Sequence, residues 1–204
     1  MISVYAGTWW LDEDGIYSVA SGYKWFRGML PAMSWHSWIW NSVNLPKHCF
    51  IGWLIMRKRL LTKDRLCRLV GSTEDGCDLC GTDKETHDHI FFHCPYSRRC
   101  IQLLSDWCMT QLPTSNFEDW WSRQAFQSQA EGDAIAAILV AALYNVWWVR
   151  NQCRVNSLIF RPEYVARTVP GSSLISLGAS IGQPDLALPV HYILLYRLLA
   201  GIIN

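Results

Sequence analysis

The sequence predicts a mainly α-helical fold of the α+β class, with an N-terminal β-hairpin and a second, small β-hairpin between its helices. Half of the 204 residues are hydrophobic and 17% are charged, which provides for a core and excludes global disorder. Apolar residues recur at helical spacing in several segments, whereas aromatic and β-branched sequence beside a turn signal stands at the N-terminus. At about 100–200 residues per domain, this length fits one domain with an extension.

The N-terminal residues predict the first hairpin and a helix. Tyr5–Leu11 is aromatic and β-branched enough for a strand, residues 12–15 (Asp-Glu-Asp-Gly) form a turn signal, and residues 16–17 can return as the second strand. Ser18 suits a helix N-cap, because the residues that follow it space three apolar side chains along one helical face: Val19, Tyr23 and Phe26.

Two helices are predicted in the middle of the chain. His48–Arg59 is too densely apolar for a surface strand and indicates a buried helix. Thr62 can cap a short helix over Lys63–Leu69, in which we expect Leu66 and Leu69 to face inward.

Further helices are predicted toward the C-terminus. Pro95 fits a first helical position and is followed by apolar residues at helical spacing through Cys108. Residues 116–119 resemble another helix start. Asp133 can cap a long helix through Val149, with Asn156 as its furthest end. We therefore divide the chain into residues 1–112, a helical extension over 113–160 and a poorly defined tail over 161–204, where prolines and glycines interrupt any long element.

The charges are segregated along the chain. The formal net charge is +1, which excludes a dominant basic arm or acidic tail. Residues 47–68 nevertheless hold seven Lys or Arg and one Asp, and residues 74–89 hold six acids and one Lys. The near-neutral total therefore hides a basic block followed by an acidic one.

A cluster of cysteines and histidines lies inside the acidic block. Cys77 and Cys80 have the two-residue spacing that points both sulfurs at one metal, and Gly81 suits the tight turn after them. His89 and Cys94 form the best second pair, which gives C-x2-C-x8-H-x4-C and predicts one Zn²⁺ in tetrahedral coordination. Pro95 would place the Cys94 thiolate at a helix N-terminus, where the helix dipole favours negative charge.

Alternatives to this ligand set stay open. His87 or His93 could replace His89 as the nitrogen ligand. A disulfide or a redox pair at Cys77 and Cys80 is less favoured, because the chain lacks a secretory signal and a thioredoxin-like context. The remaining cysteines lie in apolar helical sequence and are interpreted as small core residues: Cys49, Cys67, Cys100, Cys108 and Cys153.

The motifs argue against an enzyme. Four ligands are available for one metal, which predicts a closed, structural zinc site without an open catalytic position. The H-x-E and P-C-x-x-C pattern of the zinc deaminases is absent, as are phosphate-binding and nucleophile motifs. The sequence contains no adjacent pair of aspartates, so the carboxylates with which a polymerase holds two Mg²⁺ ions are missing.

The segments around the cysteine cluster resemble a known domain. The chain resembles the zinc-binding domain that follows the reverse transcriptase in plant LINE-type (non-LTR) retrotransposons, in order and spacing over residues 14–112. The matching segments are Asp14–Tyr23, Trp38–Trp40, Leu45–His48, Trp53-Leu54, Arg59–Leu66, Cys77–Gly81 and Glu85–Pro95, with a weaker echo at Val146–Asn151.

The resemblance implies Cys77, Cys80, His89 and Cys94 as the zinc ligands and descent from a retroelement reading frame. In that family the domain is presumed to handle nucleic acid, and other retroelement proteins would be further partners. The basic block offers side chains for RNA or DNA phosphates: Arg57, Lys58, Arg59, Lys63 and Arg65.

Two other classes compete with nucleic-acid binding. In a structural or protein-interaction module the basic block would pair with the acidic block beside it, and a truncated retroelement remnant would have no activity. A membrane protein is less favoured, because Ala134–Val149 falls short of the about 18–20 apolar residues of a span and Leu186–Ile203 is interrupted by Pro189, His191 and Arg197. The N-terminal residues do not resemble a signal peptide, so we expect an intracellular protein, nuclear or cytoplasmic, without a small-molecule substrate.

Overall fold

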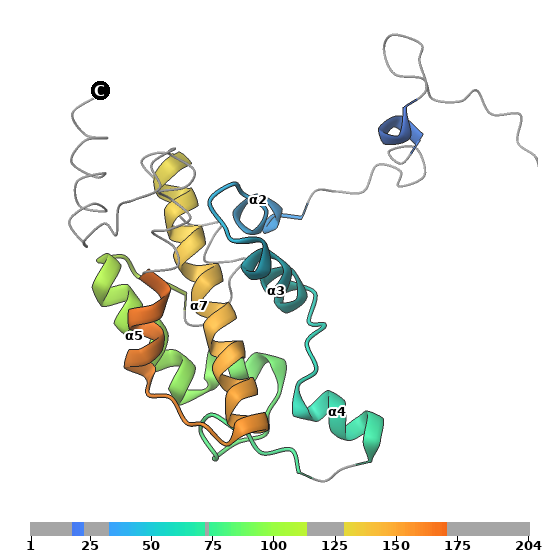
Figure 1. Ribbon diagram of the computed structural model, residues 1–204, viewed down its shortest axis with the longest axis vertical. Coiled ribbons are helices and arrows are strands. Elements are labelled where there is room, and N and C mark those ends of the chain that lie inside the picture. The colour runs from blue at the N-terminus through green and yellow to red at the C-terminus, as the bar shows by residue number, and fades with distance from the viewer. Residues whose placement is uncertain (1–17, 23–32, 72–73, 114–128, 171–204) are drawn as a thin grey trace, which may run out of the picture. The chain divides into compact units, whose positions relative to one another are not determined.

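The computed structural model describes residues 18–22, 33–71, 74–113 and 129–170 (Figure 1). The chain divides into two compact units, Met1–Met33 and Ser34–Asn204. In the first unit, residues 19–22 are helical, and Ser18 and Ser21 each donate a backbone N–H to the other's hydroxyl at 3.0 Å. Ser18 therefore caps a helix as predicted. The predicted strands within residues 5–17 lie outside the described residues.

The described part of the second unit is helical, which confirms the mainly α class. Its elements are α2 (His36–Ile39), α3 (Pro46–Met56), α4 (Lys63–Val70), the π-helical turn η1 (His89–His93), α5 (Pro95–Cys108) and α7 (Gln129–Asn156), followed by a helix over residues 162–170.

The strands of the predicted small hairpin between the helices are not seen among the described residues. Between α4 and η1, the described residues contain an isolated antiparallel bridge between Gly76 and Lys84 in place of two strands. The backbone inside this bridge is committed to a tight turn, because Cys77 donates its N–H to the Asp83 carbonyl at 2.7 Å and Gly81 donates to Cys77 at 2.8 Å. On the other side of the bridge, Glu85 donates its N–H to the Asp75 carbonyl at 2.7 Å, so the antiparallel pairing is limited to the residues next to the turn.

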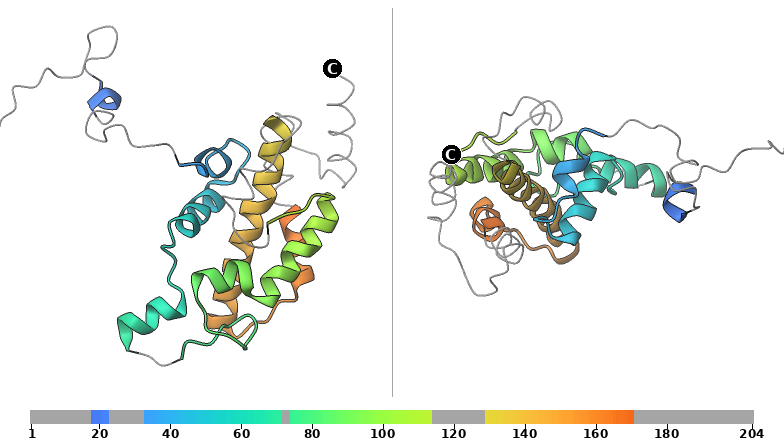
Figure 2. Two further views of the ribbon diagram at one scale, coloured as in Figure 1. Left: turned by 180° about the vertical axis from the view of Figure 1, so that it is seen from behind. Right: turned by 90° about the horizontal axis from the view of Figure 1, so that it is seen from above.

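Helix α7 is the centre of the unit. α2 and α3 lie along one side of it and α5 along the other (Figures 1 and 2). Residues 135–143 are buried on every face of α7, which explains why this segment reads as apolar all round. By length and composition α7 could cross a membrane, but 72% of its apolar window is buried inside the protein, as in the core helix of a globular fold.

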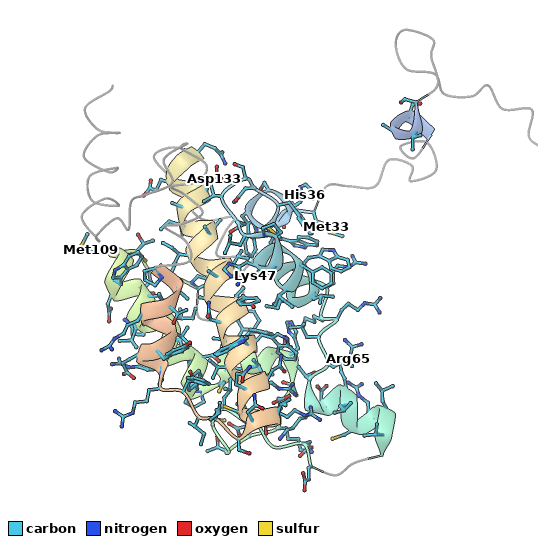
Figure 3. The ribbon with its side chains drawn as sticks, viewed as in Figure 1. Met33, His36, Lys47, Arg65, Met109 and Asp133 are labelled. Atoms are coloured by element: carbon cyan, nitrogen blue, oxygen red, sulfur yellow. The ribbon has the colours of Figure 1, made fainter. Side chains whose placement is uncertain are left out.

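Gly52 lets α3 approach α7 closely. A Cβ atom at this position would lie 3.2 Å from Cγ1 of Val140, and Ile39 of α2 closes the same space at 3.8 Å. At the start of α3, the Nζ of Lys47 lies 5.3 Å from the centre of the Tyr144 ring on α7 (Figure 3). A small residue and a cation–π contact therefore join the two helices.

The structure differs from the sequence prediction at α4. None of the residues of α4 is buried, and Leu69, predicted to face inward, is 72% exposed. The reason is that α4 is attached by its N-terminal backbone: Lys63 and Asp64 donate their N–H groups to the side chain and the carbonyl of Glu85, at 2.8 and 3.1 Å. An apolar face is not what anchors this helix.

The predicted core cysteines and the predicted tail are partly corrected as well. Cys49, Cys100 and Cys108 are buried, whereas Cys67 and Cys153 are half-buried. Residues 162–170, inside the segment predicted to lack definition, form a helix whose Val165 and Val169 join the main core. Residues 171–204 lie outside the described residues, and the proposed division at 112 and 160 stays a prediction.

Candidate metal centre

The four predicted ligand residues converge on one point. The sulfurs of Cys77, Cys80 and Cys94 and a ring nitrogen of His89 all lie within 4.8 Å of one another. Cys77 and Cys94 are 4.0 Å apart at sulfur, and the Cys80 sulfur is 3.3 Å from His89 Nε2. A tetrahedral zinc ion with this donor set has edges of about 3.5–3.8 Å, so the cluster matches the size of such a site.

The turn that presents Cys77 and Cys80 depends on Gly81. Gly81 has a φ of +70°, in the left-handed region that side chains disfavour, and its N–H closes the turn onto the Cys77 carbonyl. Thr82 then donates its hydroxyl to the Cys80 sulfur at 3.2 Å. The two sulfurs are thus directed by backbone geometry that the C-x-x-C-G sequence encodes locally.

The other two ligands come from η1 and the start of α5. Thr86 accepts the His89 N–H on its hydroxyl at 3.0 Å, which fixes the beginning of the turn. Cys94 donates its N–H to the His89 carbonyl at 2.6 Å, a five-residue closure of the π-helical type. On an α-helix, residues five apart point in different directions; the wider turn and the extended ψ of 124° at Cys94 bring the two side chains together.

The environment favours a thiolate at Cys94. Its thiol is fully buried at the N-terminus of α5. The Cys77 thiol beside it and the backbone amides of Ser97 and Tyr96 in the first helical turn lower the pKa of Cys94, outweighing the effect of burial. The same contact raises the pKa of the Cys77 thiol, so Cys94 is the sulfur of this pair that is ionised more easily, and a metal binds the deprotonated sulfur.

The two alternative histidines lie outside the cluster. The Nε2 of His87 is hydrogen-bonded to the carbonyl oxygen of Ile55 in α3 at 2.8 Å, and its Nδ1 lies 3.2 Å from Oδ1 of Asp88. Burial lowers the pKa of His87, so its ring is a neutral donor to that carbonyl. His93 is exposed. Of the described histidines, His89 is therefore the one whose ring joins the sulfurs.

A buried ion pair that sequence reasoning did not predict supports the cluster from outside. The Glu85 carboxylate is completely buried and is held by Arg150 of α7 through two nitrogens, one of them Nε at 3.0 Å from Oε2. The guanidinium group lies over the Trp147 ring at 4.8 Å and 4.0 Å from Asp78, the residue after Cys77. The available signal was an arginine that directly follows the apolar run of α7.

The five basic residues predicted to contact nucleic acid fall into two groups. Lys58 pairs with Asp88 at 2.9 Å, Lys63 pairs with Asp78, and Arg65 donates to the Lys58 carbonyl at 2.6 Å. Arg57 and Arg59 are exposed and form no ion pair among the described residues. The basic and acidic blocks of the sequence therefore neutralise each other in part, and Arg57, Arg59 and Arg65 have no carboxylate partner among the described residues.

The arrangement defines a class of protein: a small helical module organised around a possible Cys3His metal site whose ligands all come from the chain. In the comparison with known families, residues 17–100 match the family model described as zinc-binding in reverse transcriptase. Neither the curated proteins nor the solved structures gave a match. The matched range ends before α7, so Arg150 lies outside it.

Proposed function

We propose that this chain is a non-catalytic zinc-binding module of reverse-transcriptase ancestry that binds RNA or DNA. The observation that carries the proposal is the convergence of Cys77, Cys80, His89 and Cys94 within a segment that matches the zinc-binding family of reverse transcriptases. The resemblance of the flanking segments supports an origin in a plant LINE-type element, and a site of action in the nucleus or cytoplasm follows from that origin.

The non-catalytic role rests on the ligand set. Three cysteines and one histidine complete a tetrahedron, so no position is left for a water or a substrate. The nearest buried acid, Glu85, is bound by Arg150 and by the Lys63 N–H, and is therefore not placed to act as a general base. Zinc here would contribute to folding.

Nucleic-acid binding is supported by the basic turn at the end of α3, defined as Arg57, Lys58 and Arg59. The backbone N–H of Lys58 donates to the Ile55 carbonyl and that of Arg59 to the Leu54 carbonyl, each at 2.8 Å. This pair of bonds is the Schellman motif that ends a helix. The position that favours glycine in this motif is occupied by Lys58 with a φ of +49°. Arg57 and Arg59, on either side of Lys58, are exposed and form no ion pair among the described residues, which favours a role in binding anions such as phosphates.

A structural or protein-interaction module is the second candidate, and the ion pairs favour it. In the Lys58–Asp88 and Lys63–Asp78 ion pairs, basic side chains are paired with acids of the same chain and not with a ligand. Such a module could bind other retroelement proteins or be a remnant without activity. In each case the chain would have the zinc-dependent fold and would make no phosphate contacts.

A salt titration separates these candidates. We expect the zinc-loaded chain to bind fluorescein-labelled RNA or DNA with an affinity that falls linearly on a log–log plot against salt concentration. The double variant Arg57→Ala/Arg59→Ala should reduce the slope by roughly 1.4 on a single strand, at about 0.7 per phosphate contact. The matched control Arg98→Ala/Arg99→Ala removes two exposed arginines from α5 and should leave the slope unchanged. No binding to RNA or DNA at low salt would refute the proposal.

A further inference from the structure

We infer that the nucleic acid is bound single-stranded, with unpaired bases stacked on an aromatic surface of α3 formed by Phe50 and Trp53. This inference rests on the proposed function and adds to it the class of ligand. The surface continues along α3 into the basic turn, so base stacking and phosphate contacts would occur on one helix.

Helix α3 has two apolar faces, and the core needs one of them. His48, Cys49, Gly52 and Ile55 are buried and include the Gly52 contact with α7. Phe50 lies outside that face and is 53% exposed. A large exposed aromatic residue on a helix that already packs through another face is not explained by the core of the described residues.

The two rings form a continuous platform. The centres of Phe50 and Trp53 are 6.0 Å apart, and their planes are inclined by 32°. Trp53 is half-buried and packs against the core, which holds its side chain in place. Phe50 has only two side-chain torsions to immobilise, so little entropy opposes stacking of a base on it. Stacking of this kind tolerates any base.

The charge required by a nucleic acid is on the same face. Arg57 follows Trp53 by four residues and Phe50 by seven, the spacing of one stripe of an α-helix. At about 1.5 Å per residue, Trp53 and Arg57 are roughly 6 Å apart along the axis, so one strand could reach both. Arg57 is exposed and unpaired among the described residues, and Arg59 follows it.

This combination favours a single strand over a duplex and over a protein. The bases of a duplex are already stacked on each other and cannot cover an aromatic side chain without being unpaired. A protein that covered Phe50 would have to desolvate the cations of the basic turn beside it, which is costly unless each is paired. An unpaired strand satisfies the rings and the cations together.

The experiment compares one sequence in two forms. The zinc-loaded full chain is titrated, by fluorescence anisotropy, into a labelled oligonucleotide as a single strand and as its blunt duplex. We expect at least a tenfold preference for the single strand. Phe50→Leu and Trp53→Leu keep apolar bulk but remove the π face, and each should weaken single-strand binding by roughly 5- to 100-fold, as loss of one base–aromatic stack does. Duplex affinity and the salt slope should not change.

The control and the contrary outcomes are distinct. Tyr164→Leu removes another exposed aromatic residue, away from α3, and should leave both affinities unchanged. Zinc content and thermal unfolding establish that each variant folds. Equal binding of both forms, unaffected by Phe50→Leu but weakened by Arg57→Ala/Arg59→Ala, would overturn this inference and leave the proposed function standing. Absence of any binding would refute both. A change of oligomeric state in the Phe50 variant, with unchanged nucleic-acid affinity, would make the surface a protein interface and overturn the inference.

Discussion

Arg150 forms an ion pair with Glu85, which lies 65 residues earlier in the sequence, and both side chains are almost completely excluded from solvent. The same carboxylate accepts the backbone N–H of Lys63 at 2.8 Å. Glu85 therefore joins three parts of the chain: α7, the start of α4 and the loop that leads from the cysteine knuckle to His89. Because a buried carboxylate is stable only with its charge and lone pairs satisfied, these three parts depend on each other.

Removing one member of the pair should destabilise the whole unit. Arg150→Met leaves the Glu85 charge buried and uncompensated, which we expect to lower the free energy of unfolding by about 3–5 kcal/mol in urea denaturation of the zinc-loaded protein. The double variant Glu85→Leu/Arg150→Met carries no buried charge and should lose less. As a control, Lys84→Ala breaks the exposed Lys84–Asp75 pair and should have little effect. Equal stability of Arg150→Met and Lys84→Ala would contradict this role.

Zinc should bind stoichiometrically and through the four converging residues. Metal analysis of the purified chain should find one zinc per molecule, and Cys80→Ser or His89→Ala should lose it, because three ligands hold zinc far less tightly than four. His93→Ala, which removes an exposed histidine of the same turn, should retain it. Chelation should first raise amide hydrogen exchange in residues 74–96, since metal binding there is part of the folding energy. Full zinc content in both ligand variants would mean that other residues bind it.

Gly81 should be required by its backbone conformation and not by lack of space. Gly81→Ala forces a side chain into the left-handed region, at a cost of about 1–2 kcal/mol in unfolding free energy, and should weaken zinc binding in a competition with a chromophoric chelator. Nothing lies within 4 Å of a Cβ built at Gly81 or at Gly76. Gly76→Ala is therefore the matched control and should be neutral. The same loss in both variants would point to crowding or to general loop disruption.

Acidification should destabilise the fold through His48. Burial, with a smaller contribution from Lys47, lowers the pKa of His48 from 6.5 to about 4, so the ring packs against Tyr144 as the neutral form. Between these values the unfolded chain takes up a proton that the folded one does not, so stability falls as the pH drops from about 6.5 toward 4. At about 1.4 kcal/mol per pKa unit, the loss is at most about 3 kcal/mol.

The contribution of His48 can be isolated by difference. His48→Gln is neutral at every pH, so the gap in unfolding free energy between it and the parent chain should narrow on acidification over this range. Protonation of the zinc ligands affects both proteins and cancels. Parallel pH profiles for the two proteins would show that His48 is not the group responsible.

The features predictable from sequence are those whose causes are local. The ligand set lies within eighteen residues, and its spacing, with Gly81 and Pro95, directs the turns that bring the side chains together. Helices α3 and α5 begin at Pro46 and Pro95, because the fixed φ of proline suits the first position of a helix. The predicted small hairpin is represented among the described residues by an isolated antiparallel bridge between Gly76 and Lys84, without strands.

Features that depend on contacts between residues far apart in the sequence could not be predicted from local sequence patterns. No spacing rule relates Glu85 to Arg150, or Asp88 to Lys58, since the partners meet only after α7 and α3 have packed. The inward face expected of α4 failed for the same reason: a backbone hydrogen bond to Glu85 anchors the helix, and Leu69 stays exposed. Local spacing specified the convergence of the four candidate metal ligands, because their geometry is set by turns within one short segment. Packing decided which charges are neutralised and which aromatic residues face solvent, because both depend on which side chains are brought into contact across the core.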